Sequence, residues 1–167
     1  AAGRTGLGAV MGSKRLKGIV ITEMPQGKKS GVLQVNGSNR DFVRRVKQSP
    51  YYRDFARHGG AGSVLWCDEL GLMPTRNFQE HRFTEAAKID GKLLEAFTRK
   101  RTHCYRCFIG CKAELDIPDP RFEGRRANRP EFEPMLNLGA RCGLSDINAV
   151  VYLDNLCSRL GLDCISA

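Results

Sequence analysis

The sequence predicts an α+β fold, in which a short β-containing start precedes a mainly α-helical body. Two observations lead to this prediction. Short runs rich in Ile and Val, separated by glycine and proline, mark strands at residues 18–22 and 32–35. From residue 38 onward, apolar residues recur at helical spacing between capping residues and glycine stops. We therefore divide the chain into a β-containing part, residues 1–37, and a helical part, residues 38–167.

The first half contains a glycine-rich turn, the two strands and two helices. Residues 1–17 are expected to form the turn, followed by basic side chains. Ser38 or Asn39 can cap the first helix, in which Phe42, Val43 and Val46 lie at helical spacing. A second helix is expected to start at Ser49-Pro50, because proline suits the first turn, and to end at Gly59-Gly60.

The second half begins with a loop at residues 72–78, and a further helix is expected over residues 90–101. Residues 118–134 contain four prolines and are expected to be irregular. The last helix has the clearest pattern, because Ser145 or Asp146 can cap it and Gly161 can stop it. Its apolar stripe is formed by Val150, Leu153, Cys157 and Leu160.

Composition indicates a globular protein of a reducing compartment. The chain has 167 residues, of which 41% are hydrophobic and 27% charged. No apolar run approaches the roughly 20 residues of a membrane span, and the start has no signal-peptide pattern. The chain has seven cysteines, an odd number, and they are unevenly spaced along it. Both features argue against a disulfide scaffold. We therefore expect a cytoplasmic location and no membrane partner.

The formal net charge of +9 raises the question of nucleic-acid binding. The basic residues are scattered, however, and no known nucleic-acid motif organises them. We expect no nucleic-acid partner. The charge is explained by solvated faces, by surfaces that other parts of the protein cover, by anionic cofactors or by an acidic electron-transfer partner. The basic groups are Lys14-Arg15, Lys28-Lys29, Arg44-Arg45, Arg99-Lys100-Arg101 and Arg125-Arg126.

Cys104, Cys107 and Cys111 have the spacing C-x2-C-x3-C and are the strongest chemical signal in the sequence. A short turn containing Gly110 can direct three thiolates at one [4Fe–4S] cluster. Zinc is the main alternative, because three thiolates and one further ligand also suit it. Three buried, unpaired cysteines are the remaining structural alternative. None of the other four cysteines is close enough in sequence to be the evident fourth ligand.

Three other segments are candidate binding or catalytic sites. The glycines of residues 3–14, with Arg4 and Lys14, resemble a phosphate-binding loop, although a plain turn has the same composition. Glu131 and Glu133 alternate between prolines, so an extended backbone would direct both carboxylates to one side, either a site or solvent. Residues 158–163 end a helix, where backbone amides can contact a heterocycle or simply cap the helix.

Together these segments resemble one family, the tungsten-containing aldehyde ferredoxin oxidoreductases. Five segments match in the family's order, and they span nearly the whole chain: residues 2–14, 72–78, 104–111, 130–133 and 160–166. The resemblance implies an internal fragment of a larger multidomain enzyme, inactive when expressed alone. Residues 1–37 would end the N-terminal β domain that forms the cofactor base. Residues 38–167 would begin the helical domain that binds the iron–sulfur cluster and pterin.

The resemblance also implies the cofactors and their ligands. Cys104, Cys107 and Cys111 would hold a [4Fe–4S] cluster whose fourth ligand lies outside this chain. Glu133 would sit beside the metal and accept a proton. Magnesium would bridge the pterin phosphates near the backbone of residues 2–4. The tungsten (or molybdenum) bis-molybdopterin would be contacted by Ala2, Gly3, Arg4, Gly6, Lys14, Ser158, Gly161, Leu162 and Asp163.

The implied reaction is oxidation of a small aldehyde to a carboxylate, with electrons passing through the cluster to ferredoxin or an electron-transfer subunit. Ser158, Phe132 and Arg129 replace the Asp, Tyr and Gly that are usual in the family, so a different substrate is expected. One alternative is the tungsten subunit of an anaerobic benzoyl-CoA reductase complex. A homodimer is compatible with the resemblance, but without a bridging iron, because Tyr152 replaces a glutamate ligand of some members. A non-catalytic zinc-binding module is the alternative from another class.

Overall fold

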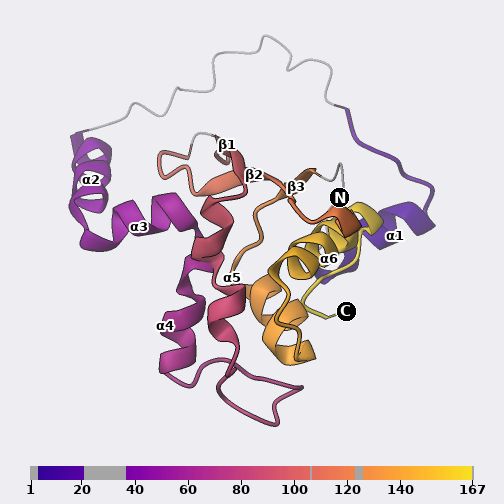
Figure 1. Cartoon of the computed structure of the whole chain (residues 1–167). Coiled ribbons are helices and arrows are strands. Elements are labelled where there is room, and N and C mark those ends of the chain that lie inside the picture. Colours follow the sequence, from indigo (N-terminus) through magenta and orange to yellow (C-terminus); the bar gives the residue numbers. More distant parts are fainter. Residues whose placement is uncertain (1–3, 21–36, 106, 123–125, 167) are drawn as a thin grey trace.

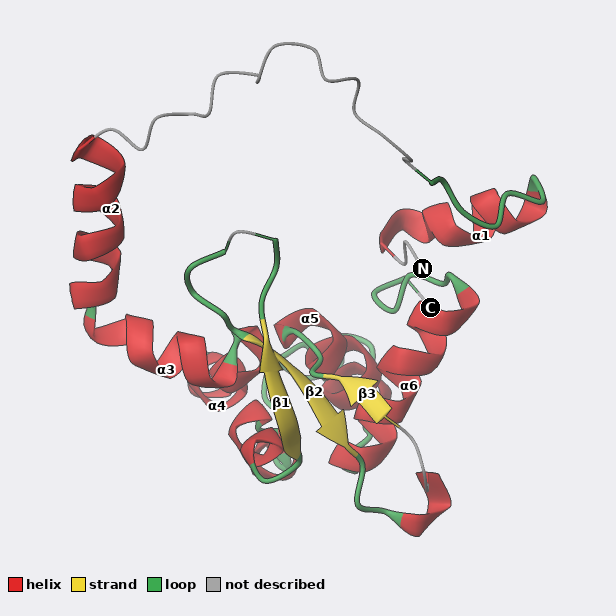
Figure 2. Ribbon diagram, turned by 90° about the horizontal axis from the view of Figure 1, so that it is seen from above, coloured by secondary structure: helices red, strands yellow, loops and turns green. Residues whose placement is uncertain are grey.

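The computed structural model describes residues 4–20, 37–105, 107–122 and 126–166 and confirms the α+β class. A three-stranded antiparallel sheet lies at one end of the described part, in the order β1 (Thr98–Thr102), β2 (Lys112–Asp116) and β3 (Arg126–Asn128) (Figure 1). Beneath it lie the helices α4 (Val64–Glu69), α5 (Phe132–Pro134) and α6 (Ile147–Leu160). Figure 2 shows the same arrangement from above, with the strands in front of these helices. Within the described residues, no helix is long and apolar enough to cross a membrane.

The N-terminal segment is helical, where a turn and a strand were expected. After a 3₁₀ turn at Arg4–Gly6, α1 spans Leu7–Ser13. Gly6 precedes it with φ of 71°, a left-handed conformation that glycine adopts without strain. Residues 18–20 form no regular structure, so the strand expected at 18–22 is wrong as far as it is described. The rest of that strand, and the one expected at 32–35, lie outside the described residues.

Helices α2, Gly37–Gln48, and α3, Pro50–His58, confirm the predicted pair. Ser49 caps α3 by accepting a hydrogen bond from the Tyr51 N–H at 3.4 Å, and Gly59 ends it with φ of 65°. A 3₁₀ turn at Gly60–Ser63 follows, and then α4, Val64–Glu69. The boundaries of α3 were predictable because Ser49 and Gly59 adjoin its two ends in sequence.

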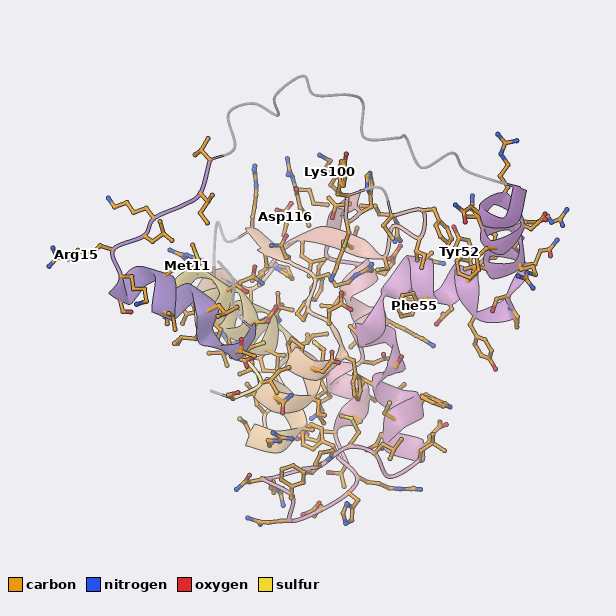
Figure 3. The ribbon with its side chains drawn as sticks, turned by 180° about the vertical axis from the view of Figure 1, so that it is seen from behind. Met11, Arg15, Tyr52, Phe55, Lys100 and Asp116 are labelled. Carbon is orange, nitrogen blue, oxygen red and sulfur yellow. The ribbon has the colours of Figure 1, made fainter. Side chains whose placement is uncertain are left out.

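The helix expected over residues 90–101 is wrong. Asp90 instead caps a 3₁₀ turn at Gly91–Glu95, and β1, Thr98–Thr102, follows. It pairs with β2, Lys112–Asp116, which pairs with β3, Arg126–Asn128. Pairing with β2 satisfies the backbone groups on one side of β1. Figure 3 shows Lys100 on the side of the sheet away from the helices. The region expected to be irregular, residues 118–134, thus contributes a strand.

The core lies between the sheet and the helices beneath it. A helical segment combines α5, Phe132–Pro134, a π turn at Met135–Gly139 and a 3₁₀ turn at Ala140–Cys142. The last helix, α6, spans Ile147–Leu160. The largest fully buried side chains come from these helices, the strands and the loops between them: Val64, Met73, Ile89, Leu94, Leu115, Met135, Val150 and Val151.

The predicted ends of α6 are confirmed. Asp146 caps it by accepting hydrogen bonds from the N–H groups of Asn148 and Ala149 at 3.0 and 3.3 Å. Gly161 ends it with φ of 75°. The predicted apolar stripe is wrong only at its last member, because Leu160 is 60% exposed. Residues 72–78 form the expected loop, joined by an isolated bridge between Thr75 and Glu80.

Candidate functional site

The loop between β1 and β2 carries Cys104, Cys107 and Cys111, and we call it the cysteine loop, residues 103–111. Strand pairing of Thr102 with Lys112 closes its base, so its first and last cysteines lie one or two residues beyond the sheet. Gly110 has φ of 69°, the turn conformation for which glycine is suited. The sheet therefore holds all three predicted ligands on a single loop.

Backbone hydrogen bonds and burial shift the pKa of two thiols of this loop in opposite directions. The N–H groups of Ile109 and Gly110 hydrogen-bond to the Cys107 sulfur and lower its pKa, which favours the thiolate that binds metals. Burial raises the pKa of the Cys111 thiol. In the described part of the chain, no three His, Cys, Asp or Glu side chains lie close enough together to hold a metal ion. The loop thus groups the predicted donors, and their convergence on a metal stays a prediction.

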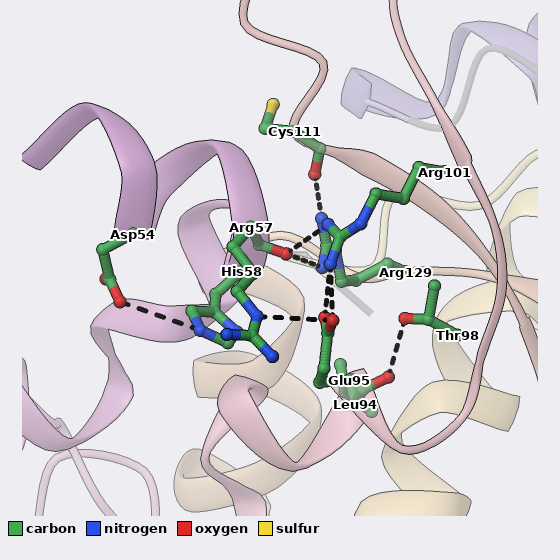
Figure 4. A network of polar contacts seen from close by, with 9 residues as sticks. All are labelled: Asp54, Arg57, His58, Leu94, Glu95, Thr98, Arg101, Cys111 and Arg129. Carbon is green, nitrogen blue, oxygen red and sulfur yellow. Dashed lines mark hydrogen bonds and ion pairs between the residues drawn. The ribbon is translucent and has the colours of Figure 1, made fainter.

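A network of charged side chains fixes the base of the cysteine loop (Figure 4). Arg129 is 5% exposed and donates to the carbonyl oxygens of Cys111 and Arg57, the second at 2.6 Å. Arg101 donates to the same Arg57 carbonyl at 2.8 Å and to both carboxylate oxygens of Glu95 at 2.5 and 2.7 Å. Helix α3, strand β1 and the residue that follows β3 are therefore joined directly beneath Cys111.

The N-terminal segment meets the end of α6, in contacts such as that of Thr5 with Asp163, 158 residues further along the chain. The Thr5 N–H donates to an Asp163 carboxylate oxygen at 2.9 Å, and the Ala9 N–H donates to the Gly161 carbonyl at 3.1 Å. This contact brings together two of the segments singled out in the sequence. A hollow of about 310 Å³ lies between them and is lined by Thr5, Gly6, Leu162, Asp163 and Ser166.

A second hollow, of about 270 Å³, adjoins the first, since Leu162 lines both. Its other lining residues are Glu131, Glu133, Pro134, Ser158, Cys164 and Ile165. The fold thus gathers Gly6, Ser158, Leu162, Asp163 and Glu133 around two adjoining hollows. We call these together the paired hollows.

The remaining predicted cofactor residues have different positions. Ala2 and Gly3 lie outside the described residues, and Arg4 is described only by its backbone, which starts the first 3₁₀ turn. Lys14 ends α1 and is exposed. It lines neither of the paired hollows.

The two carboxylates of the Pro-Glu-Phe-Glu-Pro segment differ in their partners. The segment was expected to be extended, but helix α5 begins within it, at Phe132. Glu131 forms an ion pair with Lys112 and accepts a hydrogen bond from the Gly60 N–H at 3.3 Å. Among the described residues, no hydrogen bond or ion pair engages the exposed Glu133 carboxylate. Of these two carboxylates, Glu133 is the one that no described residue engages, and its role as an acid–base group stays a prediction.

Sequence reasoning missed the contact of the buried Asp154 with the half-buried Cys164, which lines the second hollow. Asp154 is 9% exposed, and burial raises its pKa. Cys164 hydrogen-bonds to it, and burial, followed by the Asp154 charge, raises the pKa of this thiol to about 12. Asp154 lies four residues after Val150 and three before Cys157, on the buried face of α6. That spacing was the signal by which this polar position could have been found.

Replacing Gly161 by alanine tests the contact between the N-terminal segment and α6. A Cβ at this position would lie 2.8 Å from the Gly8 carbonyl carbon and 2.9 Å from the Ala9 nitrogen. The left-handed conformation of Gly161 adds about 1–2 kcal/mol of strain for alanine, and overpacking adds about 1–3 kcal/mol. We expect a clear drop in the thermal unfolding midpoint of the full-length protein.

Gly12→Ala is the matched control for this substitution. Gly12 lies in α1, and a Cβ there meets nothing within 4 Å. Alanine is the better helix former by about 1 kcal/mol, so we expect an unchanged or slightly higher midpoint. Equal midpoints for Gly161→Ala and Gly12→Ala would show that the contact is absent from the protein.

Comparisons with known proteins cover nearly the whole chain. The family model described as aldehyde ferredoxin oxidoreductase, domains 2 & 3, matches residues 38–167. Tungsten-containing aldehyde ferredoxin oxidoreductases of Thermococcus kodakarensis and Pyrococcus furiosus are each 34% identical over 172 residues, which cover 99% of this chain. The WOR-like subunit of an aliphatic sulfonate oxidoreductase of Pyrococcus furiosus is 27% identical over 173 residues. The chain spans 27% of the length of each of these relatives.

Proposed function

This chain belongs to the aldehyde ferredoxin oxidoreductase family, and from this premise we propose what the full-length protein does. It oxidises an aldehyde to a carboxylate at a tungsten–pterin centre and passes the electrons through a [4Fe–4S] cluster to ferredoxin. The observation that carries this proposal is the meeting of residues 5–6 with residues 162–163 next to Glu133. These residues come from three of the five segments that match the family.

The paired hollows would receive the pterin cofactor. Gly161 lies so close to Gly8 and Ala9 that a side chain there would push the two segments apart, so glycine allows the first hollow to form between them. Gly6, Ser158, Leu162 and Asp163 would hold the cofactor on the described side. When bound, the tungsten–dithiolene group supplies the two-electron oxidation of the carbonyl carbon. A magnesium ion near residues 2–4 would bridge the phosphates of the pterin cofactor.

The chain's own residues would bind the aldehyde and move its protons. Conversion of an aldehyde and water to a carboxylate releases two electrons and three protons. The Glu133 carboxylate, which no described residue engages, would accept one of these protons from the attacking water. Leu162 and Ile165 border the same hollow and would exclude bulk water. Glu131 would not take part in the proton transfer, because Lys112 and the Gly60 N–H already engage its carboxylate.

The cysteine loop would hold the cluster through its three thiolates. The N–H groups directed at Cys107 stabilise its charged form, as an iron–sulfur ligand needs. The ion pair of Lys112 with Glu131 connects the loop to the second of the paired hollows. A zinc-binding module gives no reason for residues 5–9 to meet residues 161–163.

Anaerobic purification of the full-length enzyme tests this function. We expect about one tungsten per chain, iron in the amount of one cubane cluster, and a broad visible absorption. The enzyme should reduce a viologen dye only when an aldehyde is added, and it should release the matching carboxylate. A colourless protein with stoichiometric zinc would contradict the proposal. So would a tungsten-loaded enzyme that reduces no dye with any of a panel of aliphatic and aromatic aldehydes.

A further inference from the structure

A third hollow, of about 420 Å³, lies beside the cysteine loop and is absent from the predicted sites. We call it the arginine hollow, because Arg53 and Arg57 of α3 and Arg101 of β1 line it. Ile109 and Gly110, which lie between Cys107 and Cys111, line the opposite part. The remaining lining residues are Tyr52 and Ala56. A molecule seated here would touch the loop that carries the predicted cluster ligands.

The charge of the arginine hollow is positive and only partly neutralised. Glu95 pairs with Arg101 at 2.5 Å and with Arg57 at 3.3 Å, so one negative charge faces three positive charges. The difference, 3 − 1, leaves a net charge of +2. Of the residues that line the hollow, none is acidic. Within the described part of the chain, no hydrogen bond or ion pair engages the exposed Arg53 side chain.

This positive surface is fixed to the cysteine loop. The Tyr52 hydroxyl donates to the Phe108 carbonyl at 3.3 Å, and Figure 3 shows Tyr52 projecting from α3. Arg101 and Arg129 both donate to the Arg57 carbonyl, and Arg129 also donates to the Cys111 carbonyl (Figure 4). The arginine hollow therefore keeps its charges at a set position relative to Cys107 and Cys111.

We propose that the arginine hollow docks the acidic face of a small one-electron carrier protein. The inference rests on the proposed function, because it takes the cysteine loop as the point where electrons leave. Complementary charge raises the rate of encounter and sets the orientation of two proteins, more than it raises affinity. A carrier held by Arg53, Arg57 and Arg101 would place its own centre against Ile109 and Gly110. Electrons would then pass singly between the two clusters without proton or group transfer.

Reversal of the Arg53 charge in the full-length enzyme tests this docking. Aldehyde-dependent reduction is measured with an acidic ferredoxin and, separately, with saturating benzyl viologen. For Arg53→Glu we expect kcat/KM for ferredoxin to fall about tenfold or more at low salt, in line with the known range of electrostatic steering. Its dependence on salt should become weaker, because fewer charges attract the carrier. The rate with the dye should be unchanged, because the dye needs no docking surface.

Two control variants sharpen the test. Arg53→Lys keeps the charge and should retain ferredoxin activity within about twofold. Arg82→Glu makes the same charge change in the loop at the far end of the molecule from the sheet (Figure 1) and should leave both rates unaltered. Equal ferredoxin rates for Arg53→Glu and Arg82→Glu would overturn the inference, and so would equal losses with ferredoxin and dye. A wild-type enzyme that reduces no dye would instead overturn the proposed function, and this inference with it.

Discussion

Replacing Cys107 by serine in the full-length enzyme is expected to abolish the iron–sulfur cluster and, with it, reduction of ferredoxin. A serine hydroxyl is a far weaker acid than a thiol, so it does not supply the charged ligand that iron requires. The N–H groups of Ile109 and Gly110 lower the pKa of the Cys107 thiol, and in the variant they would have no thiolate to stabilise. Iron per chain and the visible absorption after anaerobic purification measure the effect.

Cys142→Ser is the matched control, because Cys142 is an exposed cysteine that lies outside the cysteine loop. Its thiol donates to the Asn137 carbonyl at 3.2 Å, a bond that a serine hydroxyl can replace. We expect normal iron and normal activity. Full iron content in Cys107→Ser, or loss of iron in Cys142→Ser, would refute the assignment of the cluster to this loop.

Replacing Glu133 by glutamine is expected to lower kcat by about 10²-fold or more, the usual scale for loss of an acid–base group. Glutamine has nearly the same size, so the second of the paired hollows should keep its shape and the cofactor should stay bound. Tungsten content and aldehyde-dependent dye reduction are measured together. A loss of activity at full tungsten content would identify a chemical role for Glu133.

Glu131→Gln separates this role from the structural role of its neighbour. Glu131 joins Lys112 to the Gly60 N–H, so its loss should weaken the link between β2 and the start of the 3₁₀ turn. An exposed or half-exposed ion pair contributes little, about 0–1 kcal/mol, and we expect a small change in stability and rate. If Glu131→Gln lowers kcat more than Glu133→Gln while both retain tungsten, the catalytic assignment is wrong.

The helix boundaries were predicted well where the signal is local. Ser49 and Gly59 limit α3, and Asp146 and Gly161 limit α6, as the sequence indicates. Each boundary depends on a side chain or a left-handed glycine within a few residues of the helix end. The presence of three cysteines within eight residues is equally local, whereas the pairing of β1 with β2 makes that stretch a loop.

The strand β1 could not be predicted in the same way. Its sequence, Thr98-Arg-Lys-Arg-Thr102, has three long basic side chains that suit a helix, and it follows residues with helical spacing. Pairing with β2 decides its conformation, and residues 103–111 separate the two strands. That pairing also places Arg101 beside α3, so the arginine hollow depends on it as well.

Cysteine spacing, glycine clusters and the Pro-Glu-Phe-Glu-Pro segment are readable in a single sequence, which was therefore enough to predict which segments carry the chemistry. How these segments meet depends on the packing of the folded chain. Thr5 reaches Asp163, and Glu133 but not Glu131 is left without a partner among the described residues. Contacts between residues so distant along the chain depend on how the whole core packs, and no local preference encodes them.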